Sequence, residues 1–426
     1  MLLAVAVGFA ASFFYIYDFI ARVMPAAMTH ELMAAFHIRA GSLGILTSMF
    51  FYGYAPMQIP AGVLLDRLGA RKVLTLATLF TTLATVGFAY TTHFEFAVFC
   101  RFVMGFMAAF AYIGALKVGA HWFKAKHFAI YASLVQIFGC VGAIIGEGPI
   151  AKLTEIYSWK TASLQIAGLG LIFTIIIFLV VRNEPPKAWS DYIGYQPEAA
   201  HSNNKRLPFW VIFKSRDLWT TALFGFAIWA PITIFAVLWG SPFFKRAYHM
   251  SSVDAASMLS LVWVGVAIGG PIVTFLSSWF HKRRLLMGIA AVIGIIASVW
   301  IIYFTPQAYG LTVILLLLFG LASSSMALCF GLVMDTQPTA LIATASGFIN
   351  MAIVLGGLTL QPAAGFILDF VWQGQHSQTG SAIYTLSNYH MALLVVPLAF
   401  LLAALTAIFL VRERFYHTEK SVNEIM

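Results

Sequence analysis

The sequence predicts an all-α membrane protein with twelve transmembrane helices in two six-helix pseudo-repeat bundles. Three observations predict it: a very apolar composition, twelve apolar runs of membrane-spanning length, and similarity between the two halves. Hydrophobic residues make up 61% of the 426 residues and charged residues only 10%, and the mean hydropathy is +0.88. A soluble protein of this length needs more polar surface than this, so we expect lipid to be its main solvent.

Each apolar run has roughly 18–25 residues, which is enough for a helix to cross a bilayer. The predicted helices cover 2–27, 42–65, 73–91, 95–117, 128–151, 161–181, 218–241, 254–279, 285–304, 309–332, 341–367 and 387–411. A polar stretch separates the sixth run from the seventh. The predicted domains are an N-terminal six-helix bundle (1–181), a cytoplasmic linker (182–217), a C-terminal six-helix bundle (218–411) and a cytoplasmic tail (412–426).

The two halves match each other at a constant offset, which indicates an internal repeat. Adding 213 to the residue number places Pro149 on Pro362 and Trp159 on Trp372. Matches of Pro and Trp at one offset are harder to obtain by chance than matches of common apolar residues. Two parallel repeats with a substrate site between them are typical of membrane transporters.

The distribution of Lys and Arg predicts the topology. The side opposite the linker holds Arg39, Lys152, Lys160, Lys245 and Arg246, and two more Arg lie within helices. All other Lys and Arg fall on the linker side, so we expect both termini and the linker in the cytoplasm. The net charge of +9 then follows from topology and indicates no nucleic-acid partner. The first run lacks a basic start, so it is expected to be a retained helix and not a cleaved signal.

A dense cluster of charges lies between the second and third runs. The stretch from Gly62 to Lys72 is similar to the loop between helices 2 and 3 of the major facilitator superfamily, G-x-L-x-D-R-x-G-x-R-[KR]. Every fixed position of that pattern is filled. The positions that we assign to a gating motif are Gly62, Asp66, Arg67, Gly69, Arg71 and Lys72, with Arg101 from the R-x-x-x-G motif of the fourth run.

Two further segments carry the resemblance. The segment 40–71 looks like the organic-anion and sugar-phosphate branches of the superfamily, and like the phagosomal amino-acid transporters of intracellular bacteria. Residues 142–149 resemble the Gly-Pro motif of antiporters, but Glu147 interrupts it. The resemblance implies secondary transport by alternating access, in a monomer of the bacterial inner membrane. It also implies that Asp66 latches the two halves at the N-terminus of the eleventh helix. The alternative is that the charges of the loop only fix the topology.

Asp18 and Arg22 stand four residues apart in the first run and therefore share one helix face. Charges inside a bilayer need a partner or a wet cavity. The two side chains either neutralise each other or act on substrate and proton. In the second case the planar guanidinium of Arg22 binds a substrate carboxylate or phosphate, and Asp18 either competes for Arg22 or accepts a proton.

Glu147 is the other acid expected inside the membrane, away from the helix ends. Its neighbours Gly146 and Gly148 let another backbone approach closely. We predict that it takes part in proton coupling. The alternatives are an ion pair with Arg101 or contact with extracellular water.

Polar and aromatic side chains of the helices are candidates for contact with a substrate. The predicted substrate-binding residues are Arg22, Tyr15, Tyr52, Tyr112, Gln136, Trp229 and Asn350. The charge thus comes from the first half and the aromatic and amide groups from the second half. This asymmetry favours a small solute with a carboxylate.

The sequence contains no motif of an enzyme. We find no paired metal-ligand spacing, no nucleophile–base motif and no phosphate loop, so we expect no metal and no cofactor. The predicted function is proton-coupled uptake of a small zwitterionic or anionic solute, such as an amino acid, short peptide or carboxylate. Efflux of drugs or metabolites by proton antiport is the alternative, and a channel or a receptor is less favoured.

Overall fold

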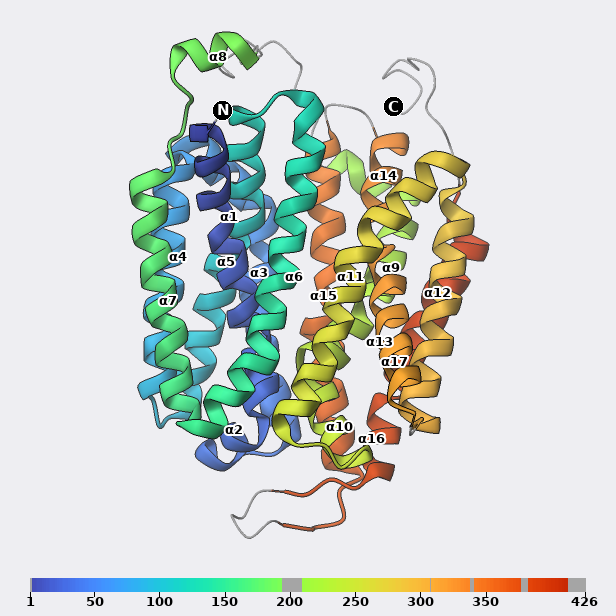
Figure 1. Ribbon diagram of the computed structural model, residues 1–426. Coiled ribbons are helices and arrows are strands. Elements are labelled where there is room, and N and C mark those ends of the chain that lie inside the picture. Colours follow the sequence, from blue (N-terminus) through green and yellow to red (C-terminus); the bar gives the residue numbers. More distant parts are fainter. Residues whose placement is uncertain (1, 194–208, 307, 338–340, 377–381, 413–426) are drawn as a thin grey trace.

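Long helices run side by side through the full height of the molecule (Figure 1). The computed structural model describes residues 2–193, 209–306, 308–337, 341–376 and 382–412. Within these ranges helices dominate, and β-structure is limited to a single isolated bridge, His376 with Ala382. The predicted all-α fold is therefore confirmed.

The first half of the chain forms one bundle (Figure 1). Its helices are α1 (Leu2–Val23), the 3-10 turn η1 (Met24–Met28), α2 (Thr29–Phe36), α3 (Ala40–Leu68), α4 (Ala70–Tyr90), α5 (Phe94–Trp122), α6 (Ala125–Ile156) and α7 (Trp159–Val180). The first predicted helix thus stops short of residue 27, because Pro25 cannot donate a backbone hydrogen bond to continue it.

The second half forms the other bundle, and several of its membrane spans are composed of consecutive helical segments (Figure 1). Its elements are α9 (Arg216–Pro231), η4 (Ile232–Trp239), α10 (Gly240–Ala247), α11 (Ser252–Phe280), α12 (Arg283–Val299), η5 (Trp300–Phe304), α13 (Tyr309–Ser324), α14 (Ala327–Thr336), α15 (Ile342–Phe370), α16 (Leu386–Leu393), α17 (Val395–Leu405) and η7 (Thr406–Leu410). Between the bundles the linker contains α8 (Lys187–Ile193) and η3 (Phe209–Lys214). The linker residues 194–208 and the tail residues 413–426 lie outside the described part.

Eleven helices of the described residues are long and apolar enough to cross a membrane. The twelfth span is α3, which has 29 residues, as many as α5 or α11. Gly, Ser, Pro and Tyr residues along it lower its hydropathy, and it is not among the eleven. Twelve spans in two bundles agree with the predicted architecture.

The internal repeat is visible in how helices pack. A Cβ on Gly53 of α3 would lie 2.3 Å from the carbonyl oxygen of Phe102 in α5. In the second half, a Cβ on Gly265 of α11 would lie 2.3 Å from the carbonyl oxygen of Leu317 in α13. Both crossings therefore require glycine, because any side chain would separate the helices. Gly53 and Gly265 differ by 212 residues, an offset close to the one found in the sequence.

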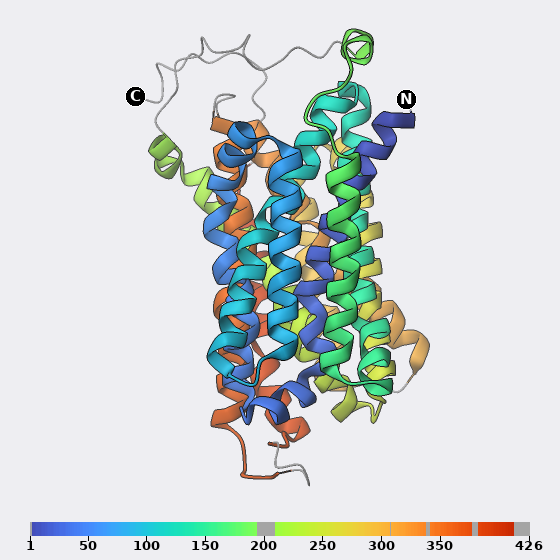
Figure 2. The ribbon, with the colours of Figure 1, turned by 90° about the vertical axis from the view of Figure 1, so that its left-hand side faces the viewer.

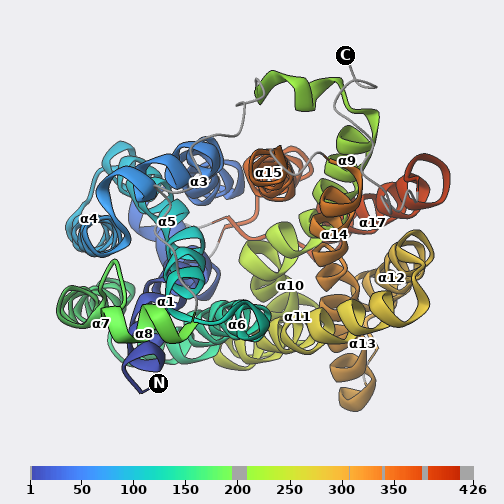
Figure 3. The ribbon, with the colours of Figure 1, turned by 90° about the horizontal axis from the view of Figure 1, so that it is seen from above.

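The two ends of the molecule are distinct. We call the end with α8 and the turn at Gly69 the linker face, and the end with α2, α10 and α16 the far face. Figures 1 and 2 place α8 and α2 at opposite ends. The halves meet along two pairs of helices, α3 with α15 and α6 with α11, as the view along the helices shows (Figure 3). The space between these pairs contains the candidate site.

Candidate transport site

A cavity of about 500 Å³ lies between the two halves. Its polar lining consists of Tyr15, Tyr54, Tyr112, Ser133, Gln136, Thr274, Ser278 and Asn350. The lining residues of α6 come from its first part and those of α11 from its last part, which are the parts nearer the linker face. The cavity therefore extends from the middle of the molecule toward the linker face.

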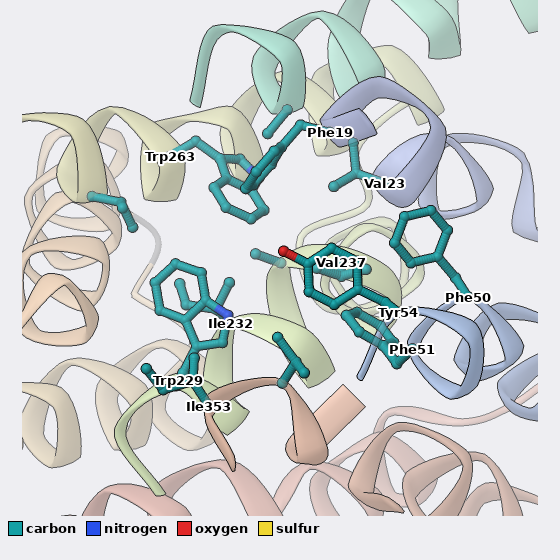
Figure 4. Packing of buried hydrophobic residues seen from close by; sticks show 14 of the residues in the cluster. Phe19, Val23, Phe50, Phe51, Tyr54, Trp229, Ile232, Val237, Trp263 and Ile353 are labelled. Atoms are coloured by element: carbon teal, nitrogen blue, oxygen red, sulfur yellow. The ribbon is translucent and has the colours of Figure 1, made fainter. Parts of the chain in front are cut away.

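An aromatic layer closes the inner end of this cavity. Phe19 of α1 packs edge-to-face on Trp263 of α11 with ring centroids 5.6 Å apart. Trp263 in turn contacts Trp229 of α9, at 6.4 Å between centroids, and Tyr15 stacks edge-on against Phe19 at 5.0 Å. The rings of Phe19, Trp263 and Trp229 reach from the first half to the second (Figure 4). Trp229 thus belongs to the closing layer and does not line the cavity.

Glu147 lies beyond this layer and joins the halves. Its Oε1 accepts a hydrogen bond of 2.7 Å from Nε1 of Trp263, and Ser260 donates to Oε2 at 3.5 Å. The carboxylate is completely buried, with an exposed fraction of 0%. Its described partners are neutral, so the two alternatives, a pair with Arg101 and contact with extracellular water, are both wrong for this conformation. Gly148 lets α6 approach Ser257 of α11, as its position next to Glu147 predicted.

A second set of contacts closes the far face. The carboxylate of Asp369, near the end of α15, accepts hydrogen bonds from the backbone N–H groups of Ala40 at 3.2 Å and Gly41 at 2.8 Å. Tyr384 donates to Asp369 at 2.5 Å and accepts from Ala40 at 3.0 Å. Arg39 adds a cation–π contact with Trp372, 5.5 Å from the ring centroid. The structure is thus closed at the far face and has its cavity on the linker side.

Asp18 and Arg22 form the ion pair that their spacing predicted. Nη2 of Arg22 lies 2.9 and 3.1 Å from the two carboxylate oxygens. Both side chains are buried, and aromatic rings surround the guanidinium, with Phe19 at 4.4 Å and Tyr54 at 4.9 Å from their centroids. Nε of Arg22 is buried and has no hydrogen-bond partner within the described residues. Because Tyr54 also lines the cavity, Arg22 lies one aromatic ring behind the cavity wall.

Arg101 has a different environment from the one predicted. It is fully buried in the first half, where Nη1 donates to the carbonyl oxygen of Ala21 at 2.5 Å and Nη2 to that of Arg22 at 3.3 Å. The carbonyl of Ala21 would bond to the N–H of residue 25 in a regular helix, but residue 25 is proline. Arg101 therefore supplies the missing donor at the end of α1. Its described hydrogen bonds do not involve the Gly62–Lys72 loop.

The charged loop is fixed within the first half. Asp66 forms an ion pair with Lys117 of α5, not with an Arg or with α15 as the resemblance implied for the closed state. The loop side chain of Arg71 donates to the carbonyl of Phe178 in α7 at 2.9 Å. Gly69 has φ +81, and a Cβ there would lie 2.5 Å from Asn183. Arg67 and Lys72 are exposed, and Gly62 has open space around its Cα.

The second half holds a counterpart of this loop with the charges exchanged. Arg283, at the start of α12, pairs with Asp335 of α14 at 2.9 Å. Arg284 donates to the carbonyl of Ala407 at 3.2 Å, much as Arg71 does to Phe178. Ser278, which stands where Asp66 does at an offset of 212 residues, lines the cavity.

The other predicted binding residues have mixed outcomes. Tyr15, Tyr112, Gln136 and Asn350 line the cavity. Tyr52 does not: it is 43% exposed on the outer side of α3. The residue that takes its place is Tyr54, since two steps along an α-helix turn a side chain by about 200° to the opposite face.

Sequence reasoning also missed three polar residues. Gln58 lies in the predicted second helix and accepts a hydrogen bond of 2.5 Å from Asn350 across the two halves. Asp369 and Tyr384 lie near the far face and were not assigned a role. A signal for Asp369 was available, because an acid in the last turn of a helix is unfavourable next to its own dipole and needs another donor.

Comparison with known proteins agrees with this architecture. The family described as the Major Facilitator Superfamily matches residues 3–360. The chain is 23% identical over 370 residues to the uncharacterized transporter YybO of Bacillus subtilis (strain 168), covering 83% of this chain and 85% of that protein. It is 22% identical over 350 residues to the probable sulfoacetate transporter SauU of Cupriavidus necator, covering 78% and 80%. It is 23% identical over 388 residues to the probable L-galactonate transporter of Escherichia coli (strain K12), covering 88% and 82%.

Solved structures show the same fold. A bacterial homolog of the human lysosomal transporter Spinster, in an inward-facing and unoccupied conformation, superposes with a TM-score of 0.76 at 17% identity, covering 98% of this chain and 99% of that one. The nucleoside transporter NupG superposes with a TM-score of 0.71 at 15% identity, covering 95% and 98%. The family match, the two six-helix bundles and the cavity between them lead to one conclusion: this chain is a multi-pass membrane transporter, not an enzyme, and it belongs to the Major Facilitator Superfamily.

Proposed function

We propose that this protein is a secondary active transporter that takes up a small organic anion or zwitterion with a carboxylate group, together with protons. The observation that carries the proposal is the buried Arg22–Asp18 pair one ring behind the cavity. A fully charged guanidinium in a membrane interior needs an anion. In this conformation Asp18 supplies it, and a substrate carboxylate can take its place.

The proposed coupling follows from competition for Arg22. A carboxylate substrate that binds Arg22 while Asp18 keeps its charge would place two anions beside one cation. Protonation of Asp18 removes one of these charges, and the guanidinium then binds the substrate with its planar donor face. Nε of Arg22, which is buried and has no partner among the described residues, provides a donor for that bond. Proton and substrate would therefore enter together.

The cavity supports a small substrate. Its volume of about 500 Å³ lies within the range of small-molecule sites. The cavity wall offers hydroxyl and amide groups to such a substrate, from Tyr15, Tyr112, Gln136 and Asn350. Two relatives are named as probable transporters of organic anions, one of sulfoacetate and one of L-galactonate. These names support an organic anion as the substrate class.

Glu147 is proposed as a second proton site. It is buried, no cation pairs with it in the described part of the chain, and its hydrogen bonds cross from α6 to α11. A change in its protonation would alter a contact that keeps the far face closed. Proton binding and opening of the far face would thereby be linked.

The remaining parts of the proposal concern orientation and the latch. The excess of Lys and Arg on the linker face supports a cytoplasmic linker and cytoplasmic termini, so the cavity would face the cytoplasm here. Bacterial relatives support the bacterial inner membrane. When the cytoplasmic side closes, Asp66 would leave Lys117 and meet the N-terminus of α15. We propose that the transporter acts as a monomer.

Efflux is the second candidate, and one observation favours it. The wall that α11 and α14 contribute to the cavity is largely apolar, with Val266, Phe275 and Phe330. Such a wall suits an apolar drug or metabolite. Arg22 disfavours cationic drugs, which prefer a site lined by carboxylates.

Flux into proteoliposomes tests the proposal. A labelled panel of sugar acids, sulfonates, amino acids and dipeptides would be offered with and without an inward proton gradient. We expect accumulation of one anionic class that depends on the gradient, and loss of it in Arg22→Ala. Tyr52→Phe, on the outer side of α3, is the matched control and should transport normally. Outward flux of apolar compounds, with no accumulation of any member of the panel, would overturn the proposal in favour of efflux.

A further inference from the structure

A second pocket lies outside the transport site, on the linker face of the first half. It has a volume of about 350 Å³ and is formed by the start of α1, the start of α6 and α8. Of the lining residues that the structure describes, it shares none with the central cavity. Seen from the linker face, α8 lies across the ends of α1 and α6 (Figure 3).

We call this pocket the groove. Specific contacts hold α8, which covers it, in place. Nε1 of Trp189 in α8 donates to the carbonyl of Trp122 at 2.9 Å. Trp189 also contacts Tyr192, with ring centroids 5.1 Å apart. Nζ of Lys124 lies 3.7 Å from the centroid of the Tyr192 ring. The linker helix is thus docked on the bundle, and it encloses the groove from above.

The walls of the groove are apolar and continue into the surface that faces lipid. Val5 and Phe9 of α1 are each 38% exposed, and Ile130 of α6 is 61% exposed. These residues lie within helices that cross the membrane. The groove is therefore open sideways to the bilayer, at the level where headgroups meet acyl chains.

The charge of the groove has one sign. Among the described lining residues, Lys124 and His127 are the only ionisable side chains apart from tyrosine hydroxyls, and none is Asp or Glu. A cation at the top of an apolar groove matches the two parts of a phospholipid, an anionic headgroup and an acyl chain. Basic pockets between helices on the cytoplasmic side are suited to anionic headgroups.

We propose that this groove binds an anionic phospholipid from the leaflet at the linker face. The phosphate would lie at Lys124 and His127, and one acyl chain would follow Phe9 and Ile130 into the bilayer. The ring of Tyr192 would cover the glycerol region. The site is independent of the transported substrate and of the proposed coupling.

Native mass spectrometry of the full-length protein tests this site. The protein would be released from detergent after incubation with phosphatidylglycerol or phosphatidylcholine of equal chain length. We expect phosphatidylglycerol to bind at least about fivefold more tightly, the ratio expected for one cation near a headgroup. Lys124→Gln with His127→Gln should abolish that preference. Lys152→Gln, an exposed change in the far-face part of α6, is the control and should retain it.

A second measurement locates the acyl chain. Brominated phosphatidylglycerol in nanodiscs should quench tryptophan fluorescence more strongly in the wild type than in Trp189→Phe. Inorganic phosphate at millimolar concentration should not displace the lipid, since the groove also holds an acyl chain. Equal binding of both lipids, or unchanged binding in the folded double variant, would overturn the proposal. Displacement by phosphate alone would show an ion site without a lipid.

Discussion

The carboxylate of Asp369 accepts a hydrogen bond of 2.8 Å from the backbone N–H of Gly41, and this bond joins the last turn of α15 to the first turn of α3. The first N–H groups of a helix have no partner within the helix. Here the acceptor comes from the other half of the molecule, 328 residues away in the chain. The positive end of the α3 dipole thus helps to hold the far face closed.

Removing this acceptor should open the far face. Loss of a side-chain acceptor at a helix N-terminus costs about 0.5–2 kcal/mol, which corresponds to roughly a 2- to 30-fold change in a two-state population. In Asp369→Ala we expect a longer distance between spin labels at residues 35 and 373, measured by double electron–electron resonance. Asp369→Asn keeps one acceptor oxygen and should give a smaller change. An unaltered distance distribution in Asp369→Ala would show that this contact does not control closure.

Tyr384 should keep the far face insensitive to pH near neutrality. Burial, together with its hydrogen bond to Asp369, raises the pKa of the Tyr384 hydroxyl well above its ordinary value. Because the pKa is raised in the folded protein, the Tyr384 hydroxyl stabilises the closed far face fully at any pH below the ordinary tyrosine pKa of about 10. This stabilisation is lost only as the pH rises through the raised pKa. The same spin-label distance should therefore stay constant from about pH 6 to 9. Tyr384→Phe should lengthen it equally at every pH in that window. A pH-dependent distance that disappears in Tyr384→Phe would contradict this.

Glu147 and Trp263 offer a pair of variants that separate a proton site from a structural bond. Glu147→Gln can still accept the hydrogen bond of Trp263 through its amide oxygen, but it cannot bind a proton. We expect this variant to stay folded and to transport without any response to a proton gradient. Full gradient response in Glu147→Gln proteoliposomes would exclude Glu147 from coupling.

Trp263→Phe tests the structural role of the hydrogen bond between Trp263 and Glu147. It removes the Trp263 donor and leaves the buried carboxylate, within the described residues, only the hydrogen bond of 3.5 Å from Ser260. An unsatisfied buried polar group costs about 1–3 kcal/mol, so thermal unfolding in detergent should occur at a lower temperature than in the wild type. Gradient response per folded molecule should persist. If Trp263→Phe instead lost the gradient response while it stayed folded, the indole itself would belong to the coupling.

The Asp18–Arg22 pair should show strong non-additivity. Removing one member of a buried ion pair leaves an uncompensated charge and costs about 3–5 kcal/mol. Asp18→Asn combined with Arg22→Gln leaves none, so the double variant should be far more stable than the sum of the single effects predicts. Denaturant unfolding of the four proteins measures this. Additive effects would mean that the two charges do not depend on each other.

Parts of this site could be predicted from the sequence, and the reasons are local. Asp18 and Arg22 are four residues apart, so helical geometry alone brings them together. Tyr52 was preferred to Tyr54 because the rotation of α3 about its axis cannot be derived from a helix with apolar residues on all sides. The absolute rotation depends on the close crossing of Gly53 with Phe102 in α5.

The contacts between the halves could not be predicted from the sequence, for a different reason. Asp369 and Gly41, like Gln58 and Asn350, are hundreds of residues apart and belong to opposite halves. Their register depends on how two complete bundles pack, and on which side of the membrane the transporter is closed. The same holds for Asp66, whose partner in this conformation is Lys117.

Arg101 should act as a structural cap whose importance depends on Pro25. Arg101→Met removes the donor to the carbonyls of Ala21 and Arg22, and each buried carbonyl left without a partner costs about 1–3 kcal/mol. We expect a clear loss of thermal stability in detergent. Pro25→Ala restores an N–H that can bond to the carbonyl of Ala21, so Arg101→Met should destabilise the Pro25→Ala protein less than the wild type.

Arg101→Lys keeps the charge but not the forked donor, so its thermal stability should fall between those of the wild type and Arg101→Met. If Arg101→Met were equally harmful in both backgrounds, its role would lie in its charge and not in the end of α1. A gating role, as the R-x-x-x-G resemblance implied, would then regain support.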